Sequence, residues 1–259
     1  MKVLALVGTG IKTISHITEE AKGYIVSCDK VLYLLNEPLL ESYIKKIAKN
    51  SQSLDPVYFQ SQSREDAYKN IANKIHTEME SVNSLCVILY GHPCVFATPG
   101  LLALSEFEIN DDVDITVCAA VSAQDCLYAD LRFDPADGGV QTFDATEYLL
   151  YDKLIDTYSH VVIYQIGMVG NLGLPTNSVN MEAINFIKKK LIGLYNKNKK
   201  AIIYESALYP STKPRISEFN LDKLEKQNLT TISTLYIPPV EVQRTVNSEA
   251  LKLLNKISW

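Results

Sequence analysis

Three side chains in the first third of the chain could act together on a proton. Arg64 and Tyr68 are four residues apart, so on a helix they share one face, and Tyr58 precedes them across the polar loop 60–63. A guanidinium beside a phenol favours the phenolate, so the phenols could serve as a base and the arginine as the partner of an oxyanion. The spacing equally fits an arginine at the start of a helix beside two half-buried tyrosines.

Residues 85–100 have the pattern of a strand, an exposed turn and a helix start. The apolar run 85–89 stops at Tyr90-Gly91-His92-Pro93, and Thr98-Pro99 is typical of the first residues of a helix. In open α/β sheets, ligands bind at the loops that leave the carboxyl ends of strands. This turn is therefore a candidate ligand-binding loop, and an ordinary strand-to-helix connection is the alternative.

A glycine pair follows the first apolar run of the chain. Gly8-Thr9-Gly10 invites a dinucleotide-binding interpretation, but the third glycine of that fingerprint would fall at Thr13. The acidic residue that should end the second strand is also missing, unless Glu37 takes its place. We therefore rank a dinucleotide site low.

Strands and helices alternate along the chain, and they would carry these residues. Strands are expected at 3–7, 30–35, 85–89, 113–120, 160–166, 201–205 and 230–237, with 55–59 as a short extended piece. Helices are expected from about residue 18, at 39–48, 65–80, 99–107 and 122–131, from residue 144, and at 179–195 and 248–257. Residues 133–140 are expected to form an interdomain or active-site loop, and 110–112 an acidic turn. The alternation favours an α/β fold with a mostly parallel sheet, split near residues 115–120.

Composition narrows the class of protein. The 259 residues are 47% hydrophobic and 21% charged, as in soluble globular proteins, and no apolar run is long enough to span a bilayer. The net charge of −5 and the scattered basic residues argue against a nucleic-acid partner, and the four scattered histidines give no support for a metal site. The five cysteines show no C-x-x-C pair and sit mostly in apolar runs, as reduced core residues of a cytoplasmic protein do.

Six motifs carry a resemblance that spans almost the whole chain. They are Gly8-Thr9-Gly10-Ile11, Tyr90-Gly91-His92-Pro93 with Val95-Phe96, the run from Val121 to Leu131, Phe133-Asp134-Pro135, Tyr204-Glu205, and the run from Ser233 to Pro239. In this order they resemble the tetrapyrrole-methylase-like S-adenosylmethionine (SAM) methyltransferases. More narrowly, together with Arg64 and Tyr68, they are similar to the borosin peptide backbone α-N-methyltransferases.

The resemblance implies two α/β domains, residues 1–116 and 117–259, with SAM in the cleft between them, and a homodimer. The residues that would line the SAM pocket are Tyr90, His92, Val95, Phe96, Ser122, Ala123, Gln165, Ser233 and Thr234. Tyr58, Arg64 and Tyr68 would face the peptide amide, and Tyr90 would lie near both ligands.

Two departures from the family pattern stand out. Cys94 replaces the glycine often found after His-Pro, which could narrow the turn or pack inward. The sequence ends at Trp259, soon after the last expected helix, so it resembles the split kind of borosin enzyme. That kind methylates backbone amides of a separate ribosomal precursor peptide, with which it could form a heterotetramer.

Three other functions remain open from the sequence. The nearest is a methyltransferase of the same fold that acts on a tetrapyrrole or another small molecule. A non-catalytic regulatory protein that binds SAM and peptide belongs to a different class, and a Rossmann dehydrogenase comes last.

Overall fold

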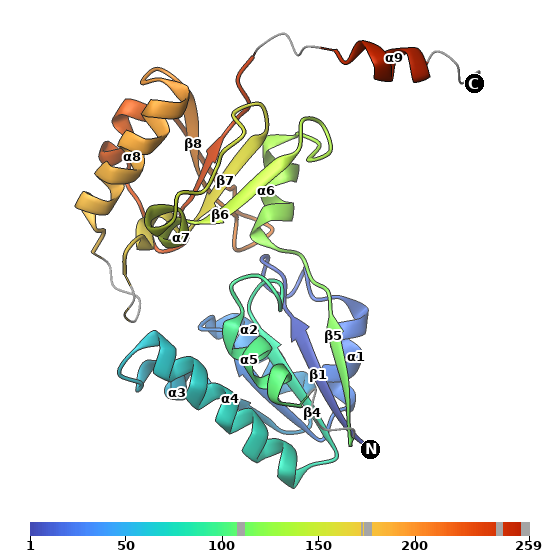
Figure 1. Cartoon of the computed structure of the whole chain (residues 1–259). Coiled ribbons are helices and arrows are strands. Elements are labelled where there is room, and N and C mark those ends of the chain that lie inside the picture. The colour runs from blue at the N-terminus through green and yellow to red at the C-terminus, as the bar shows by residue number, and fades with distance from the viewer. Residues whose placement is uncertain (108–111, 172, 174–177, 242–245, 255–259) are drawn as a thin grey trace.

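Two five-stranded sheets carry the fold, and the structure describes residues 1–107, 112–171, 173, 178–241 and 246–254. The structure is a computed structural model. Figure 1 shows one sheet with its helices below and the other above, joined where β5 runs into α6. The predicted α/β class is confirmed, and the acidic turn expected at 110–112 lies mostly outside the described residues.

The first sheet is parallel throughout, in the order β3-β2-β4-β1-β5. Its strands are β1 (Lys2–Gly8), β2 (Lys30–Leu34), β3 (Ser51–Ser53), β4 (Ser84–Leu89) and β5 (Val113–Cys118). In β1, which lies between β4 and β5, Leu6 pairs with Val87 on one side and Val117 on the other. Because both faces of a parallel sheet are covered, β1 and β4 are continuous apolar runs, which is why their positions could be predicted. All five carboxyl ends point to one edge.

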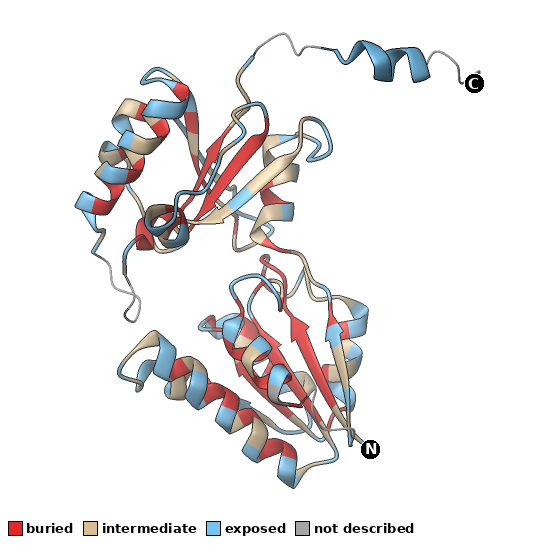
Figure 2. Cartoon of the chain, in the orientation of Figure 1, coloured by how far each residue is buried: buried red, intermediate tan, exposed pale blue. Residues whose placement is uncertain are grey.

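Helices cover both faces of this sheet. They are α1 (Glu19–Ser27), α2 (Pro38–Ile47), α3 (Asp55–Phe59), α4 (Arg64–Ser81) and α5 (Thr98–Phe107). Alternate residues of β1 face different cores: Leu4 and Leu6 pack with α4 and α5, whereas Ala5 and Val7 pack with α1 and α2. The buried strands between these layers are red in Figure 2.

The segment Asp55–Phe59, expected to be extended, is instead the short helix α3. Pro56 stands in its first turn, where the fixed φ of proline suits a helix and its missing N–H is not needed. The longer helix α4 begins as predicted, because the Ser63 side chain accepts a hydrogen bond from the backbone N–H of Asp66. Tyr58 and Tyr68 therefore lie on two successive helices.

The second sheet is mixed, in the order β6-β7-β10-β8-β9. Its strands are β6 (Val140–Asp144), β7 (His160–Tyr164), β8 (Lys200–Glu205), β9 (Arg215–Asn220) and β10 (Thr234–Ile237). Only β6 and β7 are parallel, because β10 runs antiparallel to β7 and β8, and β9 antiparallel to β8. The expectation of a mostly parallel sheet therefore holds for the first sheet alone, and β6 and β9 were not expected.

Helices pack on the second sheet as well. The helices that follow β5 in the chain are α6 (Ala123–Leu131), α7 (Ala145–Leu150), the 3-10 helix η1 (Ile166–Met168), α8 (Met181–Tyr195), η2 (Leu221–Lys226) and α9 (Ser248–Leu254), of which all but α9 belong to this layer. The predicted capping box of α6 is present, since Ser122 accepts from the Asp125 N–H while Asp125 accepts from the Ser122 N–H. The terminal α9 buries no residue and lies apart from both sheets in Figure 1.

Two sequence-based boundaries differ from the structure. Residues 133–139 join α6 to β6 within the second half, and Phe133 stacks on His160 with ring centroids 4.0 Å apart, so this loop begins with core packing and not with an active site. The division expected between residues 116 and 117 falls inside β5, whose residues Val117 and Cys118 still pair with β1. The change from one sheet to the other comes after Cys118.

Candidate functional site

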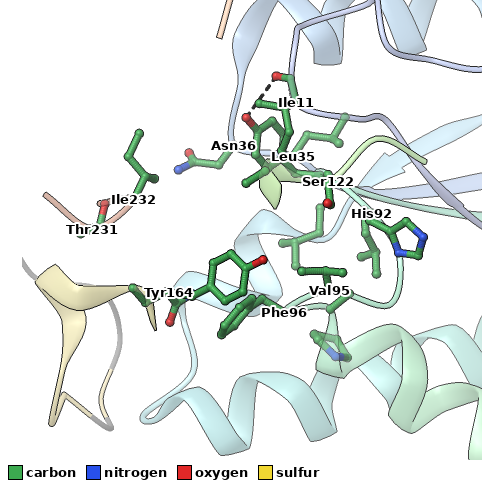
Figure 3. A pocket seen from close by; sticks show the side chains of 18 of the residues that line it. Ile11, Leu35, Asn36, His92, Val95, Phe96, Ser122, Tyr164, Thr231 and Ile232 are labelled. Carbon is green, nitrogen blue, oxygen red and sulfur yellow. Dashed lines mark hydrogen bonds between the residues drawn. The ribbon is translucent and has the colours of Figure 1, made fainter. Parts of the chain in front are cut away.

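A cavity of about 420 Å³ lies between the two sheets, at the carboxyl edge of the first. Figure 3 shows its walls: Ile11 and Leu35 follow strands β1 and β2, His92 and Phe96 follow β4, and Tyr164 ends β7. This is the edge where parallel strands place ligand-binding loops, and the volume is that of a small-molecule site.

Most of the residues proposed from the sequence meet at this cavity. Those that line it are Tyr58, Arg64, Tyr68, Tyr90, His92, Val95, Phe96, Ser122, Ala123, Gln165 and Thr234. Ser233 does not: it is fully buried, and its hydroxyl donates a hydrogen bond to Oε1 of Glu205 at 2.6 Å. The structure thus places Ser233 behind the cavity wall, and the roles of the other residues stay predictions.

Tyr58, Arg64 and Tyr68 form one wall, and the hydrogen bonds of the arginine go to backbone carbonyl oxygens and not to the phenols. Its Nε donates to the carbonyl oxygen of Gly173 at 3.3 Å and its Nη2 to that of Asn171 at 3.1 Å. The two tyrosine rings tilt toward each other with centroids 6.4 Å apart. Arg64 therefore joins α4 to the segment after η1, in the other half of the chain.

The sequence-based hypothesis is that Arg64 favours the phenolate form of these tyrosines, whereas their pKa values are raised. Burial raises the pKa of Tyr58, and the nearby charge of Arg64 opposes this without cancelling it. Burial and the neighbouring Tyr58 raise the pKa of Tyr68 in the same way, again against Arg64. In this state of the protein both phenols are protonated at neutral pH, so Arg64 alone does not hold either one ionised.

The turn after β4 forms the opposite wall. The hydroxyl of Tyr90 donates to the carbonyl oxygen of Ile11 at 3.1 Å, drawn dashed in Figure 3, and burial raises its pKa to about 12. Nδ1 of His92 accepts from the backbone N–H of Cys94 at 3.0 Å, which fixes the imidazole in the turn. Cys94 itself is exposed, so the departure from glycine does not pack inward.

Glycines let the loops after β1 and β4 touch. Gly10 and Gly91 exchange two backbone hydrogen bonds, of 3.1 and 3.2 Å, and both have positive φ. A Cβ on Gly8 would lie 2.2 Å from the carbonyl oxygen of Gly91, so no side chain fits at this position. The Gly8-Thr9-Gly10 motif therefore serves close packing of two loops.

The same loop cannot cradle a pyrophosphate. The N–H of Thr9 bonds to the carbonyl oxygen of Leu89, and those of Ile11 and Lys12 both bond to Nδ1 of His16. Phosphate binding needs backbone N–H groups that point at the ligand from a helix start, whereas α1 begins only at residue 19. The dinucleotide alternative therefore does not fit these contacts.

Several cavity residues were missed by the sequence analysis. Tyr164 packs edge-on against Phe96 with ring centroids 5.2 Å apart, and Figure 3 shows these two rings side by side. Asn36 lines the cavity from the end of β2, and Thr231 and Ile232 line it from the opposite side. Asn36 could have been found, because it follows a predicted strand at the same sheet edge as Tyr90. The others depend on tertiary packing.

Three cavity residues other than glycine have a left-handed backbone. Phe96 and Gln165 have φ of +53° and Asn36 has φ of +47°. Such conformations are unfavourable for L-residues and persist where the surrounding structure imposes them, often at functional sites. The loops around the cavity are therefore held in specific shapes.

Two other kinds of site have no support in the described residues. They contain no group of three or more His, Cys, Asp or Glu side chains that could hold a metal ion. No helix in that part of the chain combines the length and the hydropathy needed to cross a bilayer.

Sequence comparisons give relatives over most of the chain. It is 32% identical over 260 residues to a methyltransferase/ribosomally synthesized type I borosin cyclic peptide precursor from Coprinopsis marcescibilis, covering 97% of this chain and 66% of that protein. It is 28% identical to the methyltransferase/ribosomally synthesized cyclic peptide omphalotin A precursor from Omphalotus olearius, covering 97% and 61%. The resemblance to borosin proteins is thus confirmed, and the chain spans less than two thirds of the length of these relatives.

A fold comparison and a family profile agree with this result. The uroporphyrin-III C-methyl transferase from Thermus thermophilus, solved with S-adenyl homocysteine, superposes with a TM-score of 0.60 at 16% identity, covering 92% of each chain. The sequence profile of the Tetrapyrrole (Corrin/Porphyrin) Methylases matches residues 3–219. The chain therefore belongs to the tetrapyrrole methylase family.

Proposed function

We propose that the cavity binds SAM and that the chain transfers its methyl group to a backbone amide nitrogen of a peptide. One observation carries this proposal: the wall formed by Tyr58, Arg64 and Tyr68 shares a single cavity with the turn after β4. The names of the borosin relatives and the S-adenyl homocysteine in a protein of the same fold support it.

The lining suits SAM in size and chemistry. Apolar side chains such as Leu35, Val95 and Ile232 can enclose a flat adenine, and hydroxyl and amide groups lie among them. The aromatic rings of Phe96 and Tyr164 offer faces that attract a cation. Among the described lining residues Arg64 is the only Arg or Lys, and its guanidinium donates to two carbonyl groups.

An amide acceptor explains why a base is needed. The lone pair of an amide nitrogen is delocalised into the carbonyl group, so the nitrogen is a poor nucleophile until its proton is removed. A porphyrinoid carbon or a hydroxyl group would need less help. The phenols and the guanidinium on α3 and α4 therefore favour an amide over a tetrapyrrole.

Four residues from the two walls have distinct tasks in the proposal. The ionised Tyr68, or a phenolate shared with Tyr58, takes the amide proton and becomes a neutral phenol. Arg64 uses two of its five N–H groups on protein carbonyls, and the rest can stabilise negative charge on the acceptor oxygen. Tyr90 positions the amide, because its hydroxyl is anchored to Ile11. When bound, SAM supplies an electrophilic methyl group on a sulfonium, whose positive charge favours ionisation of a nearby phenol.

Single-turnover methylation at saturating SAM tests these assignments. Tyr68→Phe removes the base and is expected to slow methyl transfer by at least about a hundredfold. Arg64→Lys keeps the charge but loses the planar fork, so a slowing of about tenfold is expected. Tyr151→Phe is the matched control, because this exposed tyrosine lies outside the cavity. Rates near wild type for both cavity variants would exclude the assignment.

Two alternative functions, methylation of a small molecule and regulation without catalysis, predict other results. Methylation of a porphyrinoid without methylation of peptide would favour the first. Calorimetric binding of SAM and peptide without turnover would favour the second. That the peptide is a separate chain remains a prediction of the borosin resemblance.

A further inference from the structure

The loop Thr230–Thr234 forms part of the cavity wall, but the side chains that hold it in place face away from the cavity. Thr231, Ile232 and Thr234 line the cavity, and Ile232 is 64% exposed. Thr230 and Ser233 do not line it. Because Ile232 is held at the cavity surface with little packing of its own, its position depends on support from behind the wall.

That support converges on one carboxylate oxygen at the end of β8. Oε1 of Glu205 accepts hydrogen bonds from Ser233 Oγ at 2.6 Å and from Thr230 Oγ1 at 2.8 Å. It also accepts from Nη1 of Arg215 at 2.9 Å, and the Glu205 side chain is only 13% exposed. Hydrogen bonds to a charged, mostly buried acceptor are stronger than neutral ones.

Glu205 also fixes the direction of the hydrogen bonds that the Thr230 and Ser233 hydroxyl groups donate. Because both hydrogens point to the carboxylate, the oxygen lone pairs remain free to accept backbone N–H groups. Ser233 Oγ accepts from the N–H of Thr230 at 2.9 Å, and Thr230 Oγ1 accepts from that of Ile232 at 3.3 Å. The carboxylate therefore orders the backbone of the whole loop through two side chains.

The same loop holds a second part of the wall. The N–H of Ile166 donates to the carbonyl oxygen of Ser233 at 3.0 Å, and a Cβ on Gly167 would lie 2.0 Å from the carbonyl oxygen of Thr230. Gln165 and Met168, on either side of this contact, line the cavity. Movement of the loop would therefore shift the turn after β7 as well.

We propose that Glu205 is the positioning residue for the cofactor-binding wall, setting the affinity for SAM without contacting it. The inference rests on the proposed function, because it takes SAM as the occupant of the cavity. It also gives Ser233 a role different from the one expected of it, as the link between the carboxylate and the wall.

The test compares S-adenosylhomocysteine binding by calorimetry in wild type, Glu205→Gln and Glu218→Gln. Gln keeps the shape of Glu205 but removes the charge and introduces an N–H₂ donor, so binding is expected to weaken about tenfold. Backbone amides of residues 230–234 should also exchange hydrogen faster. Glu218 on β9 is the matched control: its side chain pairs with Lys200 but is 59% exposed, so its substitution should affect binding far less.

A second variant separates positioning from stability. Ser233→Ala is expected to weaken S-adenosylhomocysteine binding in the same direction, and adding it to Glu205→Gln should cause little further loss, because both act through one contact. Unchanged affinity in Glu205→Gln, with or without a lower melting temperature, would overturn the inference. Failure of the wild type to bind S-adenosylhomocysteine would instead overturn the proposed function.

Discussion

The protonation of two phenols decides whether the proposed chemistry can start. Burial raises the pKa of Tyr58 and Tyr68 above the ordinary value for tyrosine, and Arg64 offsets only part of this. Arg64 is held by carbonyl groups of the second half, so it does not approach either phenol as a direct partner. The ionised base is therefore a minor species until the cavity gains another positive charge.

This assignment predicts how methyl transfer depends on pH. A base with a raised pKa is protonated at neutral pH, and its active, ionised fraction grows as the pH rises. The single-turnover rate at saturating SAM should thus increase about tenfold per unit between about pH 7 and pH 9. In Tyr68→Phe this increase should disappear. A wild-type rate that stays flat over this range, or falls, would show that a raised-pKa phenol is not the base.

Residue types and motifs could predict most of the residues that line the cavity. They could not predict whether a side chain points into the cavity or away from it. Tyr90 and His92 follow a predictable strand, so their place at the sheet edge was foreseeable. Ser233 lies in an equally suggestive motif, yet its hydroxyl turns to Glu205. Only the pairing of β10 with β8 brings those two residues together.

The loops after β1 and β4 pack directly against each other beside the cavity. Their contact depends on the absence of side chains at Gly8 and on the exchanged hydrogen bonds of Gly10 and Gly91. The position of Tyr90, and through it one end of the cavity, depends on this contact, because Tyr90 bonds to Ile11 just beyond Gly10.

Two glycine substitutions test this packing. Gly8→Ala places a Cβ against the Gly91 carbonyl oxygen, which the backbone and its hydrogen bond to Gly10 hold in place. The free energy of unfolding should therefore fall by about 3 kcal/mol. Gly23→Ala is the matched control: its Cβ meets nothing within 4 Å in α1, so stability should rise by about 1 kcal/mol. Chemical denaturation measures both. Equal effects of the two substitutions would contradict the packing role of Gly8.

The elements differ in how far their sequences reveal them. Buried parallel strands such as β1 and β4 are continuous apolar runs, and α6 carries its own capping box, so both kinds could be predicted. The edge strand β9 has six residues, of which only Phe219 is buried, and it follows a proline-containing loop. The short α3 has too few residues for a helical period, and its nature depends on Pro56.

The two halves of the chain make the cavity together. Phe96 from the first half meets Tyr164 from the second, and the hydroxyl of Tyr209 donates to Glu37 across the halves at 3.0 Å. Neither half alone carries both the wall of Arg64 and the wall of Thr231–Thr234. A homodimer and a cytoplasmic location remain predictions from the sequence.

The location of the transferred methyl group tests the central claim most directly. The chain is incubated with methyl-labelled SAM and either peptides that carry an apolar C-terminal stretch or a porphyrinoid, and tandem mass spectrometry locates the label. We expect the label on a backbone nitrogen of the peptide in the wild type and its loss in Tyr68→Phe. Label on the porphyrinoid with none on any peptide would contradict the account.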